Sequence, residues 1–178
     1  SLEDTLRKVD KDLKDNMRRL EETAEKVRRD IDRDEERLRR ISEELHRRIE
    51  ELIKRLSRDE RVKRKVEELK KRNEDNEREY KDTVRRIKEE IKRLEDEYKK
   101  HLEDVARRLE EIRRRGEPVE DVVRDAKRLL DEHHDLARKI VEDLRRLLED
   151  LHRKSKKSVE DNERLLKRME EILRETER

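Results

Sequence analysis

The apolar residues of this chain repeat every 18 residues, and this period limits the possible folds more than any other feature does. An α-helix has about 3.6 residues per turn, so the repeat spans about five turns of a straight helix. A heptad repeat would instead require a left-handed supercoil, and an 11-residue repeat a right-handed one. The period therefore predicts nearly untwisted helices. The clearest repeats are Leu2, Leu20, Leu38 and Leu56; Val9, Val27 and Leu45; Val62, Tyr80 and Tyr98; and Val123, Val141 and Val159.

Two interruptions divide this pattern into three segments of similar length. Near Ser57 and Asp59 the apolar phase changes, and either residue can cap the N-terminus of a following helix. Basic residues before Gly116 and a proline at 118 are typical of one helix ending and another beginning. An unbroken helix of about 110 residues through the first interruption is the alternative. We predict an all-α, long antiparallel up-down-up three-helix bundle, with helices over about 2–56, 60–114 and 118–175 in one domain of residues 1–178.

The charge balance supports a folded helical assembly and excludes several classes of partner. Charged residues make up 61% of the chain and apolar residues only 28%, which indicates disorder when the charges are blocky or of one sign. Here 55 basic and 53 acidic residues are finely mixed. The chain therefore lacks the one-sided basic field that nucleic-acid binding needs. We also expect no membrane partner, because no apolar run is long enough to cross a bilayer and no signal-peptide core is present.

Polar residues occupy several positions where the helical pattern calls for apolar ones. If the chain folds back at about residue 58 and again at Gly116, these residues come together at about three positions along the length of the bundle, which we call heights. We interpret them as buried hydrogen-bond networks that fix helix register, because a shift of one turn would bury a polar group against leucine. The predicted groups are Asn16 with His101 and His133; Asn73 and Asn76 with residues 41–43, His46, Ser155, Ser158 and Asn162; and Asp34 with Tyr80, Thr83 and His152.

The same residues allow functional interpretations, which we weigh as alternatives. Glu43 with His46, and Glu149 with His152, have the spacing of metal ligands in helical bundles. The two pairs lie roughly 18 Å apart in height, too far for one centre, so we predict no metal and no cofactor. His133 and His134 near His101 are compatible with a pH-responsive bundle. The chain has no cysteine and no catalytic motif, and we predict no enzyme activity.

The whole chain resembles de novo designed, untwisted three-helix bundles that are built from parametric backbones and carry buried hydrogen-bond networks. The resemblance rests on the 18-residue repeats, on the minimal connections at residues 56–59 and 116–118, and on a surface of Glu, Arg and Lys. Spectrin-like repeats also form long three-helix bundles, but they have shorter helices and an aromatic core. The resemblance implies a structural scaffold without an evolved biochemical activity.

The third segment leaves an interaction module as a further alternative. Its apolar stripe is wide, with Leu129, Leu136 and Leu147 on one flank and Leu130, Ala137 and Leu148 on the other. In a closed bundle each flank meets one neighbouring helix, and the chain is a monomer that requires no partner. If part of the stripe stays exposed, it would accept a partner helix or a second copy to form a homodimer.

Overall fold

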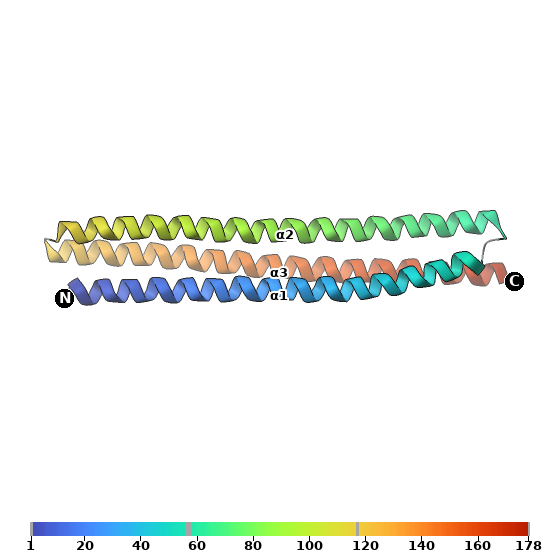
Figure 1. The fold of residues 1–178 in the computed structure, drawn as a ribbon, viewed down its shortest axis with the longest axis horizontal. Helices are drawn as coiled ribbons and strands as arrows, with labels where there is room; N and C mark the ends of the chain where they lie inside the picture. The colour runs from blue at the N-terminus through green and yellow to red at the C-terminus, as the bar shows by residue number, and fades with distance from the viewer. Residues whose placement is uncertain (1, 56–57, 117, 178) are drawn as a thin grey trace. The chain divides into compact units, whose positions relative to one another are not determined.

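The computed structural model describes residues 2–55, 58–116 and 118–177 and contains three α-helices (Figure 1). They are α1 (Leu2–Arg55), α2 (Glu60–Arg115) and α3 (Val119–Glu177). The described residues contain no strand. The prediction of an all-α three-helix bundle is thus confirmed. Where the structure describes them, the helices begin and end within two residues of the expected bounds, and Leu56 lies outside the described residues.

An aspartate caps the N-terminus of α2. The Asp59 carboxyl oxygen Oδ1 accepts a hydrogen bond from the backbone N–H of Arg61 at 3.0 Å. The backbone carbonyl of Asp59 accepts one from the backbone N–H of Lys63 at 2.9 Å. These two bonds satisfy N–H groups that a helix start otherwise leaves unpaired. Of the two capping residues that the sequence offers, Asp59 therefore takes the role. Ser57 lies outside the described residues.

Gly116 ends α2 in the way that its sequence position predicts. Its φ angle is +62°, and among the described residues no residue other than glycine has a positive φ. Glycine has no Cβ, so it adopts this left-handed conformation without the penalty that other residues incur. The next helix then begins beyond Pro118, whose carbonyl accepts a hydrogen bond from the backbone N–H of Val122 at 3.2 Å.

The chain forms two compact units, and each of the three helices contributes a part to both. Unit 1 comprises Ser1–Arg28 with Lys88–Leu147, and unit 2 comprises Arg29–Ile87 with Leu148–Arg178. This division into units does not test the prediction that residues 1–178 form a single domain, which stays a prediction.

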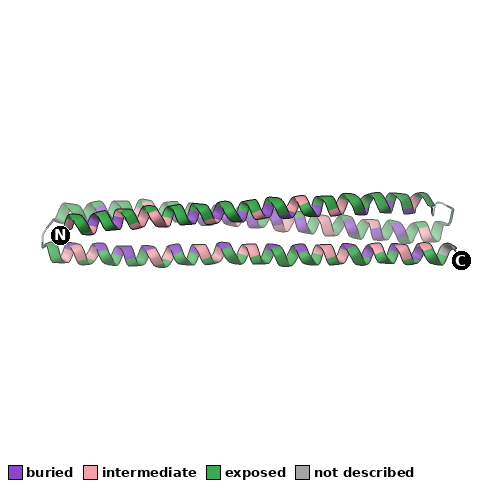
Figure 2. Cartoon of the chain, turned by 90° about the horizontal axis from the view of Figure 1, so that it is seen from below, coloured by how far each residue is buried: buried purple, intermediate pink, exposed green. Residues whose placement is uncertain are grey.

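Each unit has its own cluster of buried apolar side chains. Buried and half-buried positions recur turn by turn along the helices, with exposed positions between them (Figure 2). This recurrence is the helical periodicity of the sequence expressed as burial. The cluster in unit 1 consists of Leu6, Val9, Val105, Leu109, Ile112, Val122, Ala126, Leu129 and Leu130. The cluster in unit 2 consists of Leu45, Ile49, Leu52, Val66, Leu69, Leu165, Met169 and Ile172.

Contacts between side chains give the relative directions of the helices within each unit. In unit 2 the sequence separation of contacting α1–α2 pairs falls from 46 for Asp34 and Tyr80 to 20 for Glu50 and Lys70. In unit 1 the separation of α2–α3 pairs falls from 35 to 24 to 10 towards the connection between those helices. Consecutive helices are therefore antiparallel. In unit 2 contacting α1–α3 pairs keep nearly the same separation, 118 for Arg37 with Ser155 and 122 for Arg48 with Glu170, as parallel helices do.

Candidate functional site

The polar residues at core positions gather in three clusters, two in unit 2 and one in unit 1. We name each cluster after its central residue or residue type. The Asp34 cluster is Asp34, Tyr80 and Ser155; the Glu77 cluster is Ser42, His46, Asn73 and Glu77; and the histidine cluster is Tyr98, His101, His133 and His134 with Asn16.

In the Asp34 cluster one carboxyl group joins three helices. Tyr80 of α2 donates its hydroxyl to Asp34 Oδ2 at 3.0 Å, and Ser155 of α3 donates its hydroxyl to Oδ1 at 3.1 Å. All three side chains are buried. From the exposed side, Arg37 places a guanidinium nitrogen 3.5 Å from the Ser155 hydroxyl and 4.0 Å from Asp34 Oδ1. Both carboxyl oxygens of Asp34 thus have partners, as a buried acceptor requires.

Burial keeps the Tyr80 hydroxyl in its donor form. Desolvation raises the pKa of Tyr80 far above its ordinary value, and the neighbouring Asp34 carboxylate raises it further. A protonated phenol is what a carboxylate acceptor needs as a partner. In the Asp34 cluster the two hydroxyl groups thus each donate to one oxygen of the carboxyl group.

The Glu77 cluster gathers three donors on one carboxylate oxygen. Glu77 Oε1 accepts from the Ser42 hydroxyl, lies 2.8 Å from His46 Nε2 and accepts from Asn73 Nδ2 at 3.4 Å. Ser42 and His46 belong to α1, whereas Asn73 and Glu77 belong to α2. The cluster therefore links the first two helices through a half-buried carboxylate.

This part of unit 2 also contains two buried amide oxygens with no partner among the described residues. They are Oδ1 of Asn73 and Oδ1 of Asn162, on residues that are 0% and 4% exposed. A buried acceptor without a donor costs about 1–3 kcal/mol relative to a satisfied one. Unlike the Asp34 cluster, the polar layer around Glu77 is thus incompletely satisfied.

The histidine cluster of unit 1 is built from ring contacts. The rings of His101 and His133 are stacked, with centroids 5.2 Å apart and planes 5° from parallel. Tyr98 and His134 each meet His133 at a tilt, with centroids 5.7 and 6.1 Å away. The Tyr98 hydroxyl lies 3.4 Å from His133 Nε2. His133 is completely buried and its Nδ1 has no partner among the described residues, which also holds for Nε2 of His101.

The surroundings of these rings favour neutral histidines. Burial lowers the pKa of His133 to about 4, and the neighbouring His101 and His134 lower it further. Burial also lowers the pKa of His101, while Asp104 and Glu132 oppose this shift and Arg108 supports it. Burial raises the pKa of Tyr98 to about 12, with a smaller contribution from Glu21. On the α1 side, Asn16 Nδ2 lies 2.8 Å from His134 Nδ1, and Asp12 lies 3.9 Å from His134 Nε2.

The structure places the predicted network residues at different depths. Asp34, Asn73, Tyr80, His133, Ser155 and Asn162 are buried, and Asn16, Asn76, Thr83, His101 and Ser158 are half-buried. His46 and His152 are exposed, which differs from the prediction that they are buried. His46 still contacts Glu77. In the Asp34 cluster Ser155 takes the α3 position expected for His152, because Ser155 lies one turn beyond the fully buried Leu151.

All three predicted groupings change in their details. Asn16 contacts His134 instead of His101 or His133. Ser155 bonds to Asp34 and so belongs with Tyr80, not with the asparagines. Thr83 donates its hydroxyl to the backbone carbonyl of Glu79, within its own helix. Pairing the helices from the sequence gives a position along the bundle to within about a turn, and about a turn separates Ser155 from His152 and from Ser158. His134 directly follows His133, and only the structure shows which of these two rings meets Asn16.

Sequence reasoning missed Glu77 as a member of a cluster and placed Ser42 there only within the range 41–43, without naming it. Ser42 had a usable signal, because it lies four residues after Leu38 and three before Leu45, both of them buried. Glu77 had none, since glutamate is abundant on every face of these helices. Only its contacts with Ser42, His46 and Asn73 distinguish it from the solvated glutamates.

Among the described residues, no group of three or more His, Cys, Asp or Glu side chains is arranged to hold a metal ion. No helix in the described part of the chain is long and apolar enough to cross a membrane. No protein-family model matches the chain, and no curated protein and no solved structure matches it.

Proposed function

We propose that this chain is a structural scaffold, of the designed, nearly untwisted three-helix kind that its sequence resembles, and that it has no biochemical activity. In this proposal the buried polar clusters specify which parts of the helices face one another. The observation that carries the proposal is the Asp34 carboxyl group, which accepts from Tyr80 of α2 and Ser155 of α3 at 3.0 and 3.1 Å.

The energetic argument concerns specificity more than stability. A buried polar network often contributes no more stability than apolar residues of similar volume would. It does penalise alternatives, because any shift that separates Asp34 from its two donors leaves buried polar groups unpaired. Leucine and isoleucine at the same positions would tolerate a shifted register. The Asp34 cluster therefore supports a role in register, which is a property of a scaffold.

The test replaces the cluster and measures register directly. In the triple variant Asp34→Leu, Tyr80→Phe, Ser155→Ala we expect the helix content and thermal stability of the parent, or greater stability. Because the chain has no cysteine, introduced cysteine pairs report register without interference. Glu50→Cys with Lys70→Cys reports the observed register, because these two positions face each other across α1 and α2, where Glu50 Oε1 and Lys70 Nζ lie 3.1 Å apart. Glu50→Cys with Glu74→Cys reports a shift of about one turn.

We expect the parent to form the disulfide rapidly only in the 50–70 pair. The triple variant should form it in both pairs at comparable rates, because its core no longer distinguishes the two registers. If the triple variant oxidises as selectively as the parent, the Asp34 cluster does not determine register and the proposal fails.

A second candidate, a pH-responsive bundle, is favoured by the histidine cluster. Its specific observation is a fully buried His133 stacked on His101, where one nitrogen of each ring has no partner in the part of the chain that the structure describes. Protonation would add charge to this packed layer as the pH falls below the ordinary histidine range. The test is the free energy of unfolding between about pH 7.5 and pH 5, and an unchanged value would exclude this candidate.

A further inference from the structure

A groove of about 480 Å³ in unit 2 has a lining unlike the apolar core around it. All three helices contribute to it, through Ser42 and His46 of α1, Glu77 and Tyr80 of α2, and Ser158 and Asn162 of α3. Its volume lies within the range of about 300–1,000 Å³ that is typical of small-molecule sites. In the 18-residue pattern Ser158 and Asn162 occupy the positions of Ile140 and Leu144, which have larger apolar side chains.

An unsatisfied amide oxygen belongs to the wall of this groove. Asn162 is 4% exposed, and its Oδ1 has no hydrogen-bond partner among the described residues. The neighbouring Asn73 shares the same deficiency at its own Oδ1. Both atoms are acceptors, so each of these two oxygens lacks a hydrogen-bond donor. A ligand that fits must therefore carry N–H or O–H groups.

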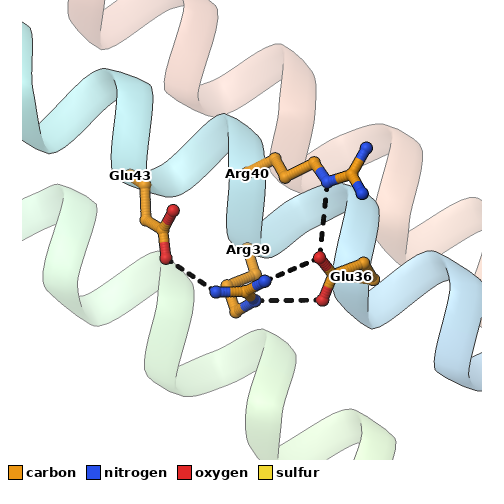
Figure 3. Close-up of polar contacts among 4 residues, drawn as sticks. All are labelled: Glu36, Arg39, Arg40 and Glu43. Atoms are coloured by element: carbon orange, nitrogen blue, oxygen red, sulfur yellow. Dashed lines mark hydrogen bonds and ion pairs between the residues drawn. The ribbon is translucent and has the colours of Figure 1, made fainter.

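The charges around the groove favour a cation. Arg39 is engaged by two of the lining glutamates, because it donates two hydrogen bonds to Glu36, at 2.6 and 3.0 Å, and one to Glu43 at 2.9 Å (Figure 3). Lys81 is the other lysine or arginine of the lining. Arg40, outside the lining, also binds Glu36, at 3.3 Å (Figure 3). Carboxylates still outnumber these three cations, since the lining includes Asp32, Glu35, Glu36, Glu43 and Glu77.

The contacts of Glu77 hold its carboxylate beside this space. Ser42, His46 and Asn73 all approach the same oxygen, Oε1. A carboxylate that is fixed by neighbouring donors is preorganised for a ligand, because its orientation costs no further ordering on binding. A positively charged donor would form charge-assisted hydrogen bonds there, which are stronger than neutral ones.

From these observations we propose that the groove binds a small organic cation with an amidinium or primary ammonium group. The cationic N–H groups face the Glu77 carboxylate and the Asn162 amide oxygen, and the apolar body of the ligand lies against Leu38 and the Tyr80 ring. Water alone would satisfy the amide oxygens but would not balance the negative charge of the excess carboxylates. This site goes beyond the scaffold role and does not depend on it.

The test compares benzamidinium with benzamide, a neutral molecule of nearly the same shape. Both are titrated into the ¹⁵N-labelled full chain, and the side-chain amide signals of Asn73 and Asn162 are followed. Asn16 serves as the internal control, because it lies in unit 1 and contacts His134. We expect saturable shifts of the Asn73 and Asn162 signals with benzamidinium, little change with benzamide, and no change at Asn16. Equal shifts with both compounds would show that the groove recognises shape and not charge, and no shift with either would show that it holds water only. Either result would overturn the proposal.

Variants separate charge recognition from shape. Glu77→Gln keeps the side-chain size and should weaken benzamidinium binding on the order of tenfold, as expected for the loss of a charged hydrogen-bond partner. Glu74→Gln, at an exposed position of the same helix outside the groove lining, should leave the affinity unchanged. If Glu77→Gln does not fold by circular dichroism, Ser158→Asp adds a carboxylate at the half-buried rim and should tighten binding severalfold. If the affinity for benzamidinium stays the same in Glu77→Gln, or in Ser158→Asp, the proposal is contradicted.

Discussion

Asp34 and Asn162 illustrate how differently two buried polar residues behave in the same unit. Asp34 has both carboxyl oxygens occupied by hydroxyl donors from two other helices. Asn162 is equally well buried, yet its amide oxygen has no partner among the described residues. A satisfied group can stabilise and orient a core, whereas an unsatisfied one costs free energy or marks a missing ligand. In our proposals a buried polar residue of this kind fixes register in the Asp34 cluster and binds a ligand at Asn162.

Removing the Tyr80 hydroxyl tests the Asp34 cluster at the level of one bond. We expect Tyr80→Phe to lower the free energy of unfolding by about 1–3 kcal/mol, because it leaves Asp34 Oδ2 buried without its donor. Urea titration measures the change. Tyr98→Phe is the matched control, since the Tyr98 hydroxyl lies 3.4 Å from His133 Nε2 and makes a weaker contact. Equal losses in the two variants would contradict a special role for the Asp34 cluster.

His133 should make the stability of the fold depend on pH. Burial lowers its pKa in the folded chain to about 4, below its ordinary value of 6.5, so the unfolded chain takes up the proton first. Above pH 6.5 both states are neutral and His133 contributes no pH dependence. As the pH falls from 6.5 towards 4, the folded state loses up to about 3 kcal/mol relative to the unfolded state. Urea titrations at a series of pH values measure this loss.

Two variants assign that pH dependence to its residue. His133→Leu replaces the titrating ring with an apolar side chain, and the part of the acid-induced loss due to His133 should disappear. His152→Gln is the control, because His152 is exposed, and it should retain the pH profile of the parent. A parent and a His133→Leu variant with the same profile would show that His133 does not titrate between pH 6.5 and 4.

At the scale of the helices, local sequence signals account for most of what is observed. The left-handed Gly116 and the Asp59 cap are both readable from residue type and position. Helix ends depend on such local bonds because the terminal N–H and C=O groups have no partner within the helix. The periodic apolar residues then determine which face of each helix is buried.

Removing the cap of α2 tests this local control. Asp59→Ala should lower the free energy of unfolding by about 1 kcal/mol, because the Arg61 N–H loses its side-chain acceptor. Asp75→Ala, in the middle of the same helix, is the control. Its carboxylate is 55% exposed in a 3.7 Å ion pair with Arg78, so its loss should change stability by no more than about 0.5 kcal/mol. Thermal or urea unfolding measures the stability of both variants. If Asp59→Ala is as stable as the parent, the capping role is contradicted.

At the scale of the whole molecule, the apolar stripe of α3 is largely covered, with Leu136, Leu147 and Leu148 half-buried and Leu129, Leu130 and Ala137 buried. Among the described residues the exposed large apolar side chains are Met17 and Val119, at 38% and 45%. Single exposed apolar residues are common on monomers and do not form an interface. We therefore expect a monomer of 22.2 kDa in sedimentation equilibrium. A species of twice that mass at micromolar concentration would favour the self-associating alternative instead.

The amino-acid sequence by itself determined the helices, their ends and their antiparallel order. These properties follow from local rules, namely the 3.6-residue period, capping and short connections. It also identified most of the buried polar residues, because asparagine, serine and aspartate stand out on an apolar stripe.

Only the tertiary structure decided which polar side chains meet. A helical position is known from sequence pairing to within about a turn, whereas a hydrogen bond requires atoms to lie within about 3.5 Å. That difference explains why Ser155, and not His152, bonds to Asp34, and why Asn16 contacts His134. It also explains why the groove beside Glu77 was not foreseen. A cavity arises from the combined volumes of side chains on three helices, and no single helix encodes it.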